Sequence, residues 1–180
     1  MRVIDFAIRE CSLGRVLIAA SERGICHVRF GDCEDALEDP LRSELPFATL
    51  ARAEVRLKQW GDALIASIEG GGDELQRAAV ELPLDVSASR FQRRVWQALQ
   101  QISRGQTRSY SDVAASLGLP RGARAVARAC SANPVAVLIP CHRVVAKNGE
   151  LGGYRWGVER KRALLVGEGA GDRVGREIGG

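Results

Sequence analysis

The first part of the chain alternates between apolar and polar residues, which is the pattern of half-buried β-strands. Ile4, Phe6 and Ile8 fall on one face of a strand expected over residues 3–9, and two more strands are expected over 15–20 and 25–30. The turns between them are short, so the pattern predicts an antiparallel meander. The acidic stretch over residues 31–40 is expected to be loop with a little helix.

Farther along, the apolar spacing becomes helical. Helices are expected over 49–68, 90–102, 110–117, 123–131 and 157–168. Ser87 or Ser89 is expected to cap the helix that starts at Arg90. The spacing predicts an α/β N-terminal domain over 1–85, a mainly α domain over 86–168 and a disordered glycine-rich tail over 169–180.

The chain has 180 residues, of which 46% are hydrophobic, and this suits one or two small domains. No apolar run approaches the roughly 18 residues of a membrane helix, and the N-terminus lacks the shape of a signal peptide. The net charge of +4 divides unevenly, with −6 over residues 1–85 and +10 over 86–180. The basic half predicts a polyanionic partner, with a solvated charged surface as the alternative.

Two short helices joined by the Gly118–Gly122 turn form a helix-turn-helix pattern, with an ordinary helix corner as the alternative. The second helix bears Arg124 and Arg128 between alanines and is therefore thin. A thin helix can approach nucleic acid closely but brings few long side chains to read base edges. We therefore expect DNA binding with little sequence preference.

The apolar run Val135–Ile139 ends in Pro140-Cys141-His142-Arg143. A cysteine that must become a thiolate benefits from basic neighbours, which lower the thiol pKa. The pattern therefore indicates a reactive cysteine, and an inert core thiol is the alternative.

The five cysteines are odd in number and show no C-x-x-C spacing, which favours reduced thiols in the cytoplasm. Cys26 and His27 are adjacent on a predicted strand and point to opposite faces, so a zinc site with Cys11 and Cys33 is not expected.

The chain resembles the O6-alkylguanine-DNA alkyltransferases, also called methylated-DNA–protein-cysteine methyltransferases. Within that family it strongly resembles the carboxy-terminal repair portion of bacterial Ada-type proteins. The segments that carry the resemblance are Asn133-Pro134-Val135, Ile139 to Val145, Gly153-Tyr154-Arg155-Trp156-Gly157, and Leu164-Leu165 followed by Glu168. It implies a ribonuclease H-like small sheet with a helix, followed by a winged helix-turn-helix domain that binds DNA and carries the reaction.

The resemblance also implies catalytic roles. Cys141 would accept the alkyl group, His142 would take the thiol proton through a water, and Glu168 would orient His142. Asn133 would organise the turn around the cysteine, and Tyr110 would line the base pocket, with its hydroxyl a plausible proton donor to the leaving guanine.

Further positions are implied to bind DNA or substrate. Arg124 would fill the gap left in the duplex by the flipped nucleotide. The implied pocket-wall positions are Val144 and Tyr154, and Arg155 stands at a position whose backbone would face the base. The implied DNA contacts are Gln92, Ser111 and Lys147.

The implied activity is irreversible, single-turnover transfer of a methyl or alkyl group from O6-alkylguanine, and as a second candidate lesion O4-alkylthymine, to Cys141. The expected protein is a monomer acting on double-stranded DNA, with no cofactor and no membrane association. No metal is expected, because Ser21 and Cys26 stand where some relatives carry zinc ligands. The regulatory half of Ada is missing from this sequence, and Met1 favours a stand-alone repair protein over part of a longer one.

Three other functions fit the sequence less well. An alkyltransferase-like protein that only binds lesions would lack the cysteine, which is present here. The recognition helix of a helix-turn-helix transcription factor should carry long polar side chains, whereas this one is rich in alanine. A cysteine hydrolase needs a base from a distant part of the chain, but the two histidines are His27 and His142, and the latter adjoins Cys141.

Overall fold

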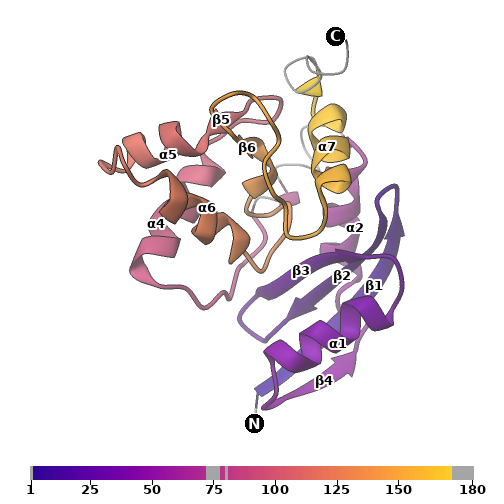
Figure 1. Cartoon of the computed structure of the whole chain (residues 1–180). Helices are drawn as coiled ribbons and strands as arrows, with labels where there is room; N and C mark the ends of the chain where they lie inside the picture. The colour runs from indigo at the N-terminus through magenta and orange to yellow at the C-terminus, as the bar shows by residue number, and fades with distance from the viewer. Residues whose placement is uncertain (1, 72–77, 80, 172–180) are drawn as a thin grey trace. The chain divides into compact units, whose positions relative to one another are not determined.

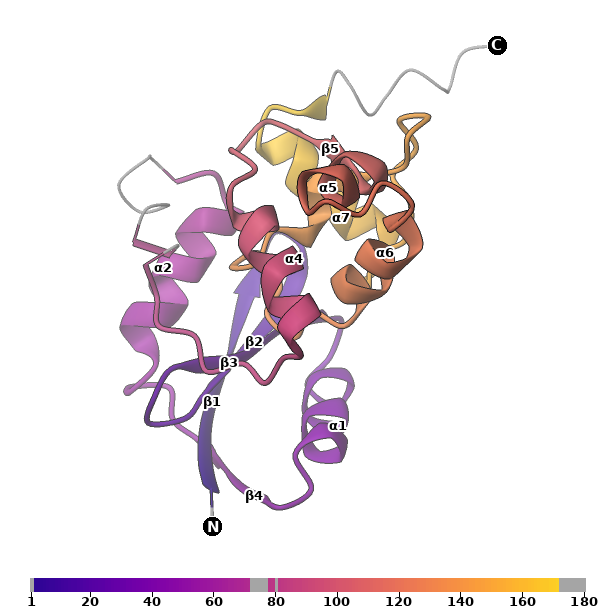
Figure 2. The same cartoon turned by 90° about the vertical axis from the view of Figure 1, so that its left-hand side faces the viewer.

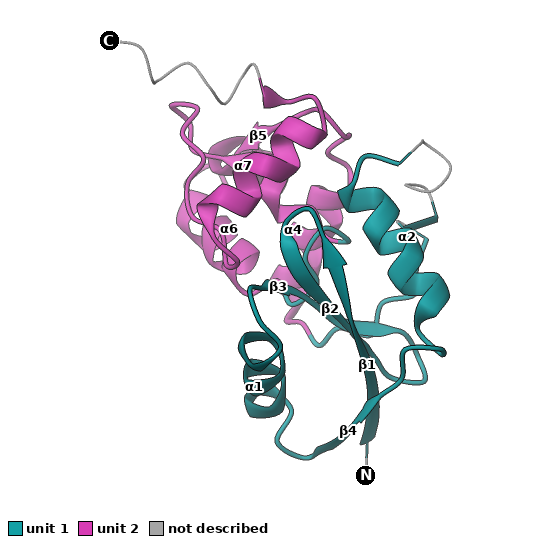
Figure 3. Ribbon diagram, turned by 90° about the vertical axis from the view of Figure 1, so that its right-hand side faces the viewer, with its two compact units in different colours: residues 1–87, 134–138 teal, residues 88–133, 139–180 magenta. Residues whose placement is uncertain are grey.

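A computed structural model describes residues 2–71, 78–79 and 81–171. The chain forms two compact units (Figure 3): residues 1–87 together with 134–138 make unit 1, and residues 88–133 together with 139–180 make unit 2. The inclusion of 134–138 in unit 1 had no signal in the sequence. The amide of Val28, in a strand of unit 1, donates to the carbonyl of Pro134 at 2.9 Å, so segment 134–138 lies along that strand.

Unit 1 is built on a four-stranded sheet in the order β3-β2-β1-β4 (Figure 1). The strands are β1 (Arg2–Cys11), β2 (Gly14–Ala20), β3 (Ile25–Gly31) and β4 (Ala48–Arg52). The first three form the predicted antiparallel meander, and β4 pairs with β1 in parallel. The helix predicted over 49–68 is therefore wrong at its start, because residues 48–52 find hydrogen-bonding partners on β1.

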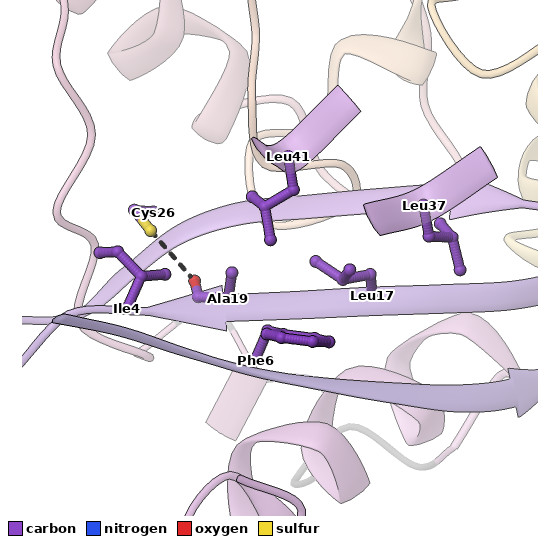
Figure 4. Packing of buried hydrophobic residues seen from close by; sticks show 7 residues of the cluster. All are labelled: Ile4, Phe6, Leu17, Ala19, Cys26, Leu37 and Leu41. Atoms are coloured by element: carbon purple, nitrogen blue, oxygen red, sulfur yellow. Dashed lines mark hydrogen bonds between the residues drawn. The ribbon is translucent and has the colours of Figure 1, made fainter. Parts of the chain in front are cut away.

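One face of this sheet packs against α1 (Asp35–Glu44). Leu37 and Leu41, one helical turn apart, join Ile4 and Phe6 in a buried cluster (Figure 4). The rest of that cluster is Leu17, Ala19 and Cys26. The helix in this region is longer than the little helix predicted within residues 31–40, because two leucines at helical spacing gain a sheet face on which to pack.

The second helix of unit 1, α2 (Lys58–Ile68), lies on the opposite side of the sheet from α1 (Figures 2 and 3). Leu64 and Ile68 are buried, whereas Val55 before the helix is exposed. The sheet is therefore covered on both faces.

Unit 2 is mainly helical, with α4 (Arg90–Gln100), α5 (Tyr110–Ser116), α6 (Ala123–Ser131) and α7 (Val158–Gly167). Ser89, not Ser87, caps α4 in a reciprocal capping box with Gln92. The indole of Trp96 on α4 donates to the carbonyl of Ala129 on α6 at 2.9 Å. Two short strands, β5 (Arg108–Ser109) and β6 (Val144–Val145), pair in parallel.

The predicted disordered tail over 169–180 begins too early, because the chain just after α7 is packed against unit 2. Ala170 is buried with Val145, Leu151 and Leu165, and its amide donates to the Leu165 carbonyl at 2.8 Å. The prediction for 172–180 falls outside the described residues. Within the described ranges, no helix has the length and apolar character needed to cross a bilayer.

Candidate active site

Two successive tight turns present Cys141. The amide of Cys141 donates to the carbonyl of Ile139 at 2.8 Å across Pro140, whose φ of −80° and ψ of 60° match an inverse γ-turn. Proline suits the centre of this turn because its ring fixes φ near that value and it has no amide hydrogen to satisfy. A 3-10 turn, η1 (Cys141–Arg143), follows at once. The side chains of Cys141, His142 and Arg143 therefore all project from one turn.

Asn133 ties this turn to the end of α6. Its side-chain amide nitrogen donates to the Ile139 carbonyl at 2.9 Å and to Cys141 Sγ at 3.3 Å, and Asn133 is fully buried. One amide group thus holds the turn and contacts the sulfur.

Cys141 is itself buried, and burial raises the pKa of its thiol above the ordinary 9.0. The Asn133 hydrogen bond and the charges of Lys161 and Arg155 act in the opposite direction and lower that pKa. The sequence had pointed to Arg143 as the basic neighbour, but its guanidinium bonds to Glu168 instead. The sulfur at rest is therefore a thiol, and its proton has to be removed before it can attack.

His142 is fully buried beside Cys141, and its Nε2 lies 2.8 Å from Glu168 Oε1. Burial would raise the pKa of Glu168, but hydrogen bonds and charge from His142 and Arg143 lower it to about 2. Because a carboxylate can only accept, Nε2 carries the hydrogen in this pair when the imidazole is neutral, and Nδ1 then holds the lone pair. Nδ1 is buried and has no hydrogen-bond partner among the described residues.

Tyr110 is brought to the same turn by the β5–β6 pair. Arg108 pairs with Val144 and Ser109 with Val145, so the start of α5 lies beside the segment that follows Cys141. Burial, together with the neighbouring thiols of Cys130 and Cys141, raises the pKa of Tyr110 to about 12. A Cβ added at Gly152, where φ is +67°, would lie 3.2 Å from the Tyr110 hydroxyl. Gly152 therefore provides the room in which that hydroxyl lies.

Lys161 is a site residue that the sequence did not single out. It is fully buried, and its Nζ donates to the carbonyls of Val144 at 2.6 Å and Gly153 at 3.3 Å. The same Nζ lies 5.9 Å from the centre of the Tyr110 ring, within range of a cation–π contact. Lys161 thus joins the two segments that flank the site, and its position one turn before Leu164 and Leu165 was the available signal.

The implied pocket-wall residues also lie in unit 2. Val144 is buried on β6, and Tyr154 packs edge-on against Trp156 with ring centres 5.2 Å apart. The Tyr154 hydroxyl is buried without a hydrogen-bond partner among the described residues. Arg155 donates to the Asn133 carbonyl at 3.4 Å and lies over the Trp156 ring.

The implied DNA contacts form a separate set. Arg124 and Lys147 are exposed, Ser111 is half-buried near the start of α5, and Gln92 uses its side-chain oxygen to cap the Ser89 amide at 2.8 Å. None of the interactions described for these four residues joins them to Cys141, and their contact with DNA stays a prediction.

No group of three or more histidine, cysteine, aspartate or glutamate residues is placed to hold a metal ion in the described part of the chain. Ser21 donates to Asp85 at 2.6 Å and Cys26 donates to the Ala19 carbonyl at 3.4 Å. Burial raises the pKa of Cys26 to about 11, which disfavours the thiolate that a metal would need.

A thiol, a buried histidine and a carboxylate held by an arginine are the groups that a protein needs to activate a cysteine as a nucleophile. Two family models match the chain. The 6-O-methylguanine DNA methyltransferase ribonuclease-like domain matches residues 5–86, and the DNA binding domain of the same enzyme matches residues 90–170.

Curated relatives agree. The bifunctional transcriptional activator/DNA repair enzyme Ada of Escherichia coli is 45% identical over 90% of this chain and 44% of its own length. A methylated-DNA–protein-cysteine methyltransferase of Methanosarcina acetivorans is 34% identical over 92% of this chain and 98% of its own. The chain belongs to the methylated-DNA–protein-cysteine methyltransferase family. It spans about half the length of the first curated relatives that it matches, 44% of one and 52% of another.

Solved structures confirm the fold class. A crystal structure of Mycobacterium tuberculosis OGT in complex with DNA superposes with a TM-score of 0.75 and 31% identity, and the match covers 94% of each chain. The predicted arrangement of an α/β N-terminal domain and a helical DNA-binding domain is therefore correct.

Proposed function

We propose that this chain repairs DNA by transferring a methyl or alkyl group from the O6 atom of guanine to Cys141 in a single turnover. The observation that carries the proposal is the set of hydrogen bonds around one turn. Asn133 contacts the sulfur, and the adjacent His142 has one nitrogen on Glu168 and the other buried without a partner in the described chain. This arrangement suits removal of a thiol proton by a neutral imidazole.

In the proposed reaction, the proton of Cys141 passes to Nδ1 of His142. Consecutive residues of a 3-10 turn point in different directions, so we propose that a water carries this proton. The thiolate then attacks the alkyl carbon, a sulfur–carbon bond forms, and the bond between that carbon and O6 breaks. The electron pair leaves with guanine, which takes up a proton, and the Tyr110 hydroxyl is the proposed donor.

Single turnover follows from the chemistry of the product, because a thioether is not readily displaced. The other buried thiol near the site belongs to Cys130, whose pKa is raised to about 12 by burial and by Cys141. Cys130 is therefore not a nucleophile at neutral pH. All five cysteines are free thiols, which fits the cytoplasm that we propose as the compartment.

We propose double-stranded DNA as the partner, bound by a monomer with little sequence preference and with the damaged nucleotide flipped out of the stack. The relative from Mycobacterium tuberculosis was solved with DNA, and helix α6 has the form that this task needs. Val126, Ala129 and Cys130 face the core, while Arg124 and Arg128 are exposed one turn apart. We assign Arg124 to the space that the flipped nucleotide vacates.

Mass spectrometry tests the proposal. The protein is incubated with a duplex carrying isotopically labelled O6-methylguanine, and the mass of the peptide that contains Cys141 is measured. We expect one labelled methyl per protein on that peptide. Cys141→Ala should abolish transfer, and Cys33→Ser, which changes an exposed cysteine of unit 1, should leave it unchanged. Label that stays on the DNA, or transfer beyond one equivalent, would contradict the proposal.

A further inference from the structure

Glu168 lies where a carboxylate should be costly. It is the C-cap residue of α7, and its side chain is only 6% exposed. The C-terminal end of a helix carries partial negative charge, and burial penalises the ionised form. Yet the pKa of Glu168 falls to about 2 despite its burial, so its surroundings outweigh both penalties.

Arg143 supplies part of that compensation, beside the larger effect of His142. Its Nε donates to Glu168 Oε2 at 2.9 Å and its Nη2 donates to Oε1 at 2.9 Å, which is the two-pronged geometry of strong arginine–carboxylate pairs. The third nitrogen, Nη1, donates to the carbonyl of Ile102 at 2.6 Å. The guanidinium is therefore fixed by three bonds, and it fixes the plane of the carboxylate in turn.

The pairing of Arg143 with Glu168 affects the protonation of His142. The charged groups that act on His142 are Glu168, which raises its pKa, and Arg143 and Lys161, which lower it. Burial is the largest influence and also lowers that pKa. Because the negative charge of Glu168 is already balanced by a permanent cation, the imidazole does not need to be protonated to satisfy it. Glu168 can then orient His142 without holding it as an imidazolium.

We propose that Arg143 is a positioning residue that keeps Glu168 ionised and correctly oriented, so that His142 remains a neutral base with an unprotonated Nδ1. The consequence for the reaction rests on the proposed alkyl transfer. The consequence for the protonation of His142 does not, and it can be measured in the resting protein.

Nitrogen NMR of histidine-labelled protein tests the resting state. The chain has two histidines, and His27 of unit 1, which pairs with Glu44, serves as an internal reference. We expect wild-type His142 at neutral pH to be protonated on Nε2 alone. In Arg143→Met the midpoint of its titration should rise by about one pH unit, the usual effect of removing a close charge. Arg143→Lys keeps a positive charge but loses the two-pronged contact with Glu168, so its midpoint should fall between those of the wild type and Arg143→Met.

Two outcomes would overturn the inference: a wild-type Nδ1 that is protonated at neutral pH, or an Arg143→Met protein in which His142 titrates as in wild type. If Arg143→Met fails to fold, the wild-type and Arg143→Lys measurements still decide. At any one pH, the His27 signal should be the same in the wild type and in both variants.

Single-turnover rates at saturating duplex DNA provide the functional readout. A neutral His142 is needed as the base, so the rate of the wild type should fall on the acid side. Arg143→Met should move that limb by about one pH unit toward higher pH and lower the rate about a hundredfold, within the usual contribution of a general base. Arg104→Met is the matched control, because Arg104 donates to the Gly167 carbonyl at 2.8 Å in the same corner of unit 2.

Arg104→Met should keep the wild-type midpoint. If the role of Arg143 were purely structural, Arg143→Met and Arg104→Met would both react more slowly, and the midpoint of the pH–rate profile would stay at the wild-type value in each. That result would contradict the inference. If the wild type transfers no methyl group while the NMR result holds, the proposed function fails and the role of Arg143 in setting the state of His142 stands.

Discussion

At the scale of single residues, three polar side chains are completely buried among the described residues of unit 2: Asn133, His142 and Lys161. Each has hydrogen bonds to named partners, as buried polar groups require. Asn133 and Lys161 both donate to backbone carbonyls, so they hold the loops around Cys141 in place. His142 bonds through its side chain to Glu168. These residues define the shape and the charge of the site together.

Lys161 should make stability depend on alkaline pH. Burial lowers its pKa from the usual 10.5 to about 8, against the opposing effect of the Cys141 and Cys130 thiols. Between these two values the unfolded chain holds a proton at Lys161 that the folded protein has lost. Stability attributable to Lys161 is therefore present above pH 10.5 and is lost as the pH falls through 8.

The measurement is the difference in free energy of unfolding between wild type and Lys161→Met, taken by denaturant titration at several pH values. This difference should move in favour of the wild type by roughly 3 kcal/mol as the pH rises from 8 to 10.5. Lys58→Met, at an exposed lysine of α2, should show no such trend. A flat difference for Lys161→Met would contradict the assignment.

At the scale of elements, helices with local signals were predicted well and elements that depend on distant partners were not. The capping boxes at Ser89 and Ser109 mark the starts of α4 and α5 in the sequence itself. In contrast, β4 is a strand because β1 offers it a parallel edge. Helix α1 contains Pro40 and acidic residues, and two leucines that pack on the sheet stabilise it. Neither partner is visible in a short window of sequence.

The cap of α4 gives an element-scale prediction. Ser89→Ala removes the side-chain oxygen that accepts the Gln92 amide hydrogen at 3.2 Å. We expect a loss of about 1 kcal/mol in the free energy of unfolding, the usual contribution of an N-cap. Ser87→Ala, the alternative cap in the sequence, should change stability little. Equal losses from the two variants in urea titrations would show that the cap is not the cause.

At the scale of the whole molecule, the charge is divided between the two halves of the chain, −6 over residues 1–85 and +10 over 86–180. Nearly all of the positive charge of the second half is arginine, which suits contacts to phosphate. Proposed DNA binding should therefore depend strongly on salt, because each neutralised phosphate releases counterions.

Binding to an undamaged duplex, measured by fluorescence anisotropy over a range of salt concentrations, tests this division. Arg128→Ala, on the exposed side of α6, should weaken binding and reduce the slope of log affinity against log salt by about one. Arg42→Ala, at an exposed arginine of α1 that pairs with Glu38, should leave the slope unchanged. A reduced slope for Arg42→Ala alone would place the DNA surface on the other half of the chain.

The sequence by itself determined the three-stranded meander, the helix-turn-helix, the basic second half and Cys141 as a candidate reactive thiol, and the family resemblance added His142, Asn133 and Glu168. These features depend on local periodicity, composition and short motifs, which a chain displays without being folded. Only the tertiary structure showed that Arg143 bonds to Glu168 and not to the sulfur, that Lys161 is buried against Val144, and that burial keeps Cys141 a thiol. Charge states in a protein depend on which groups are brought together and how far water is excluded, and both are decided by folding.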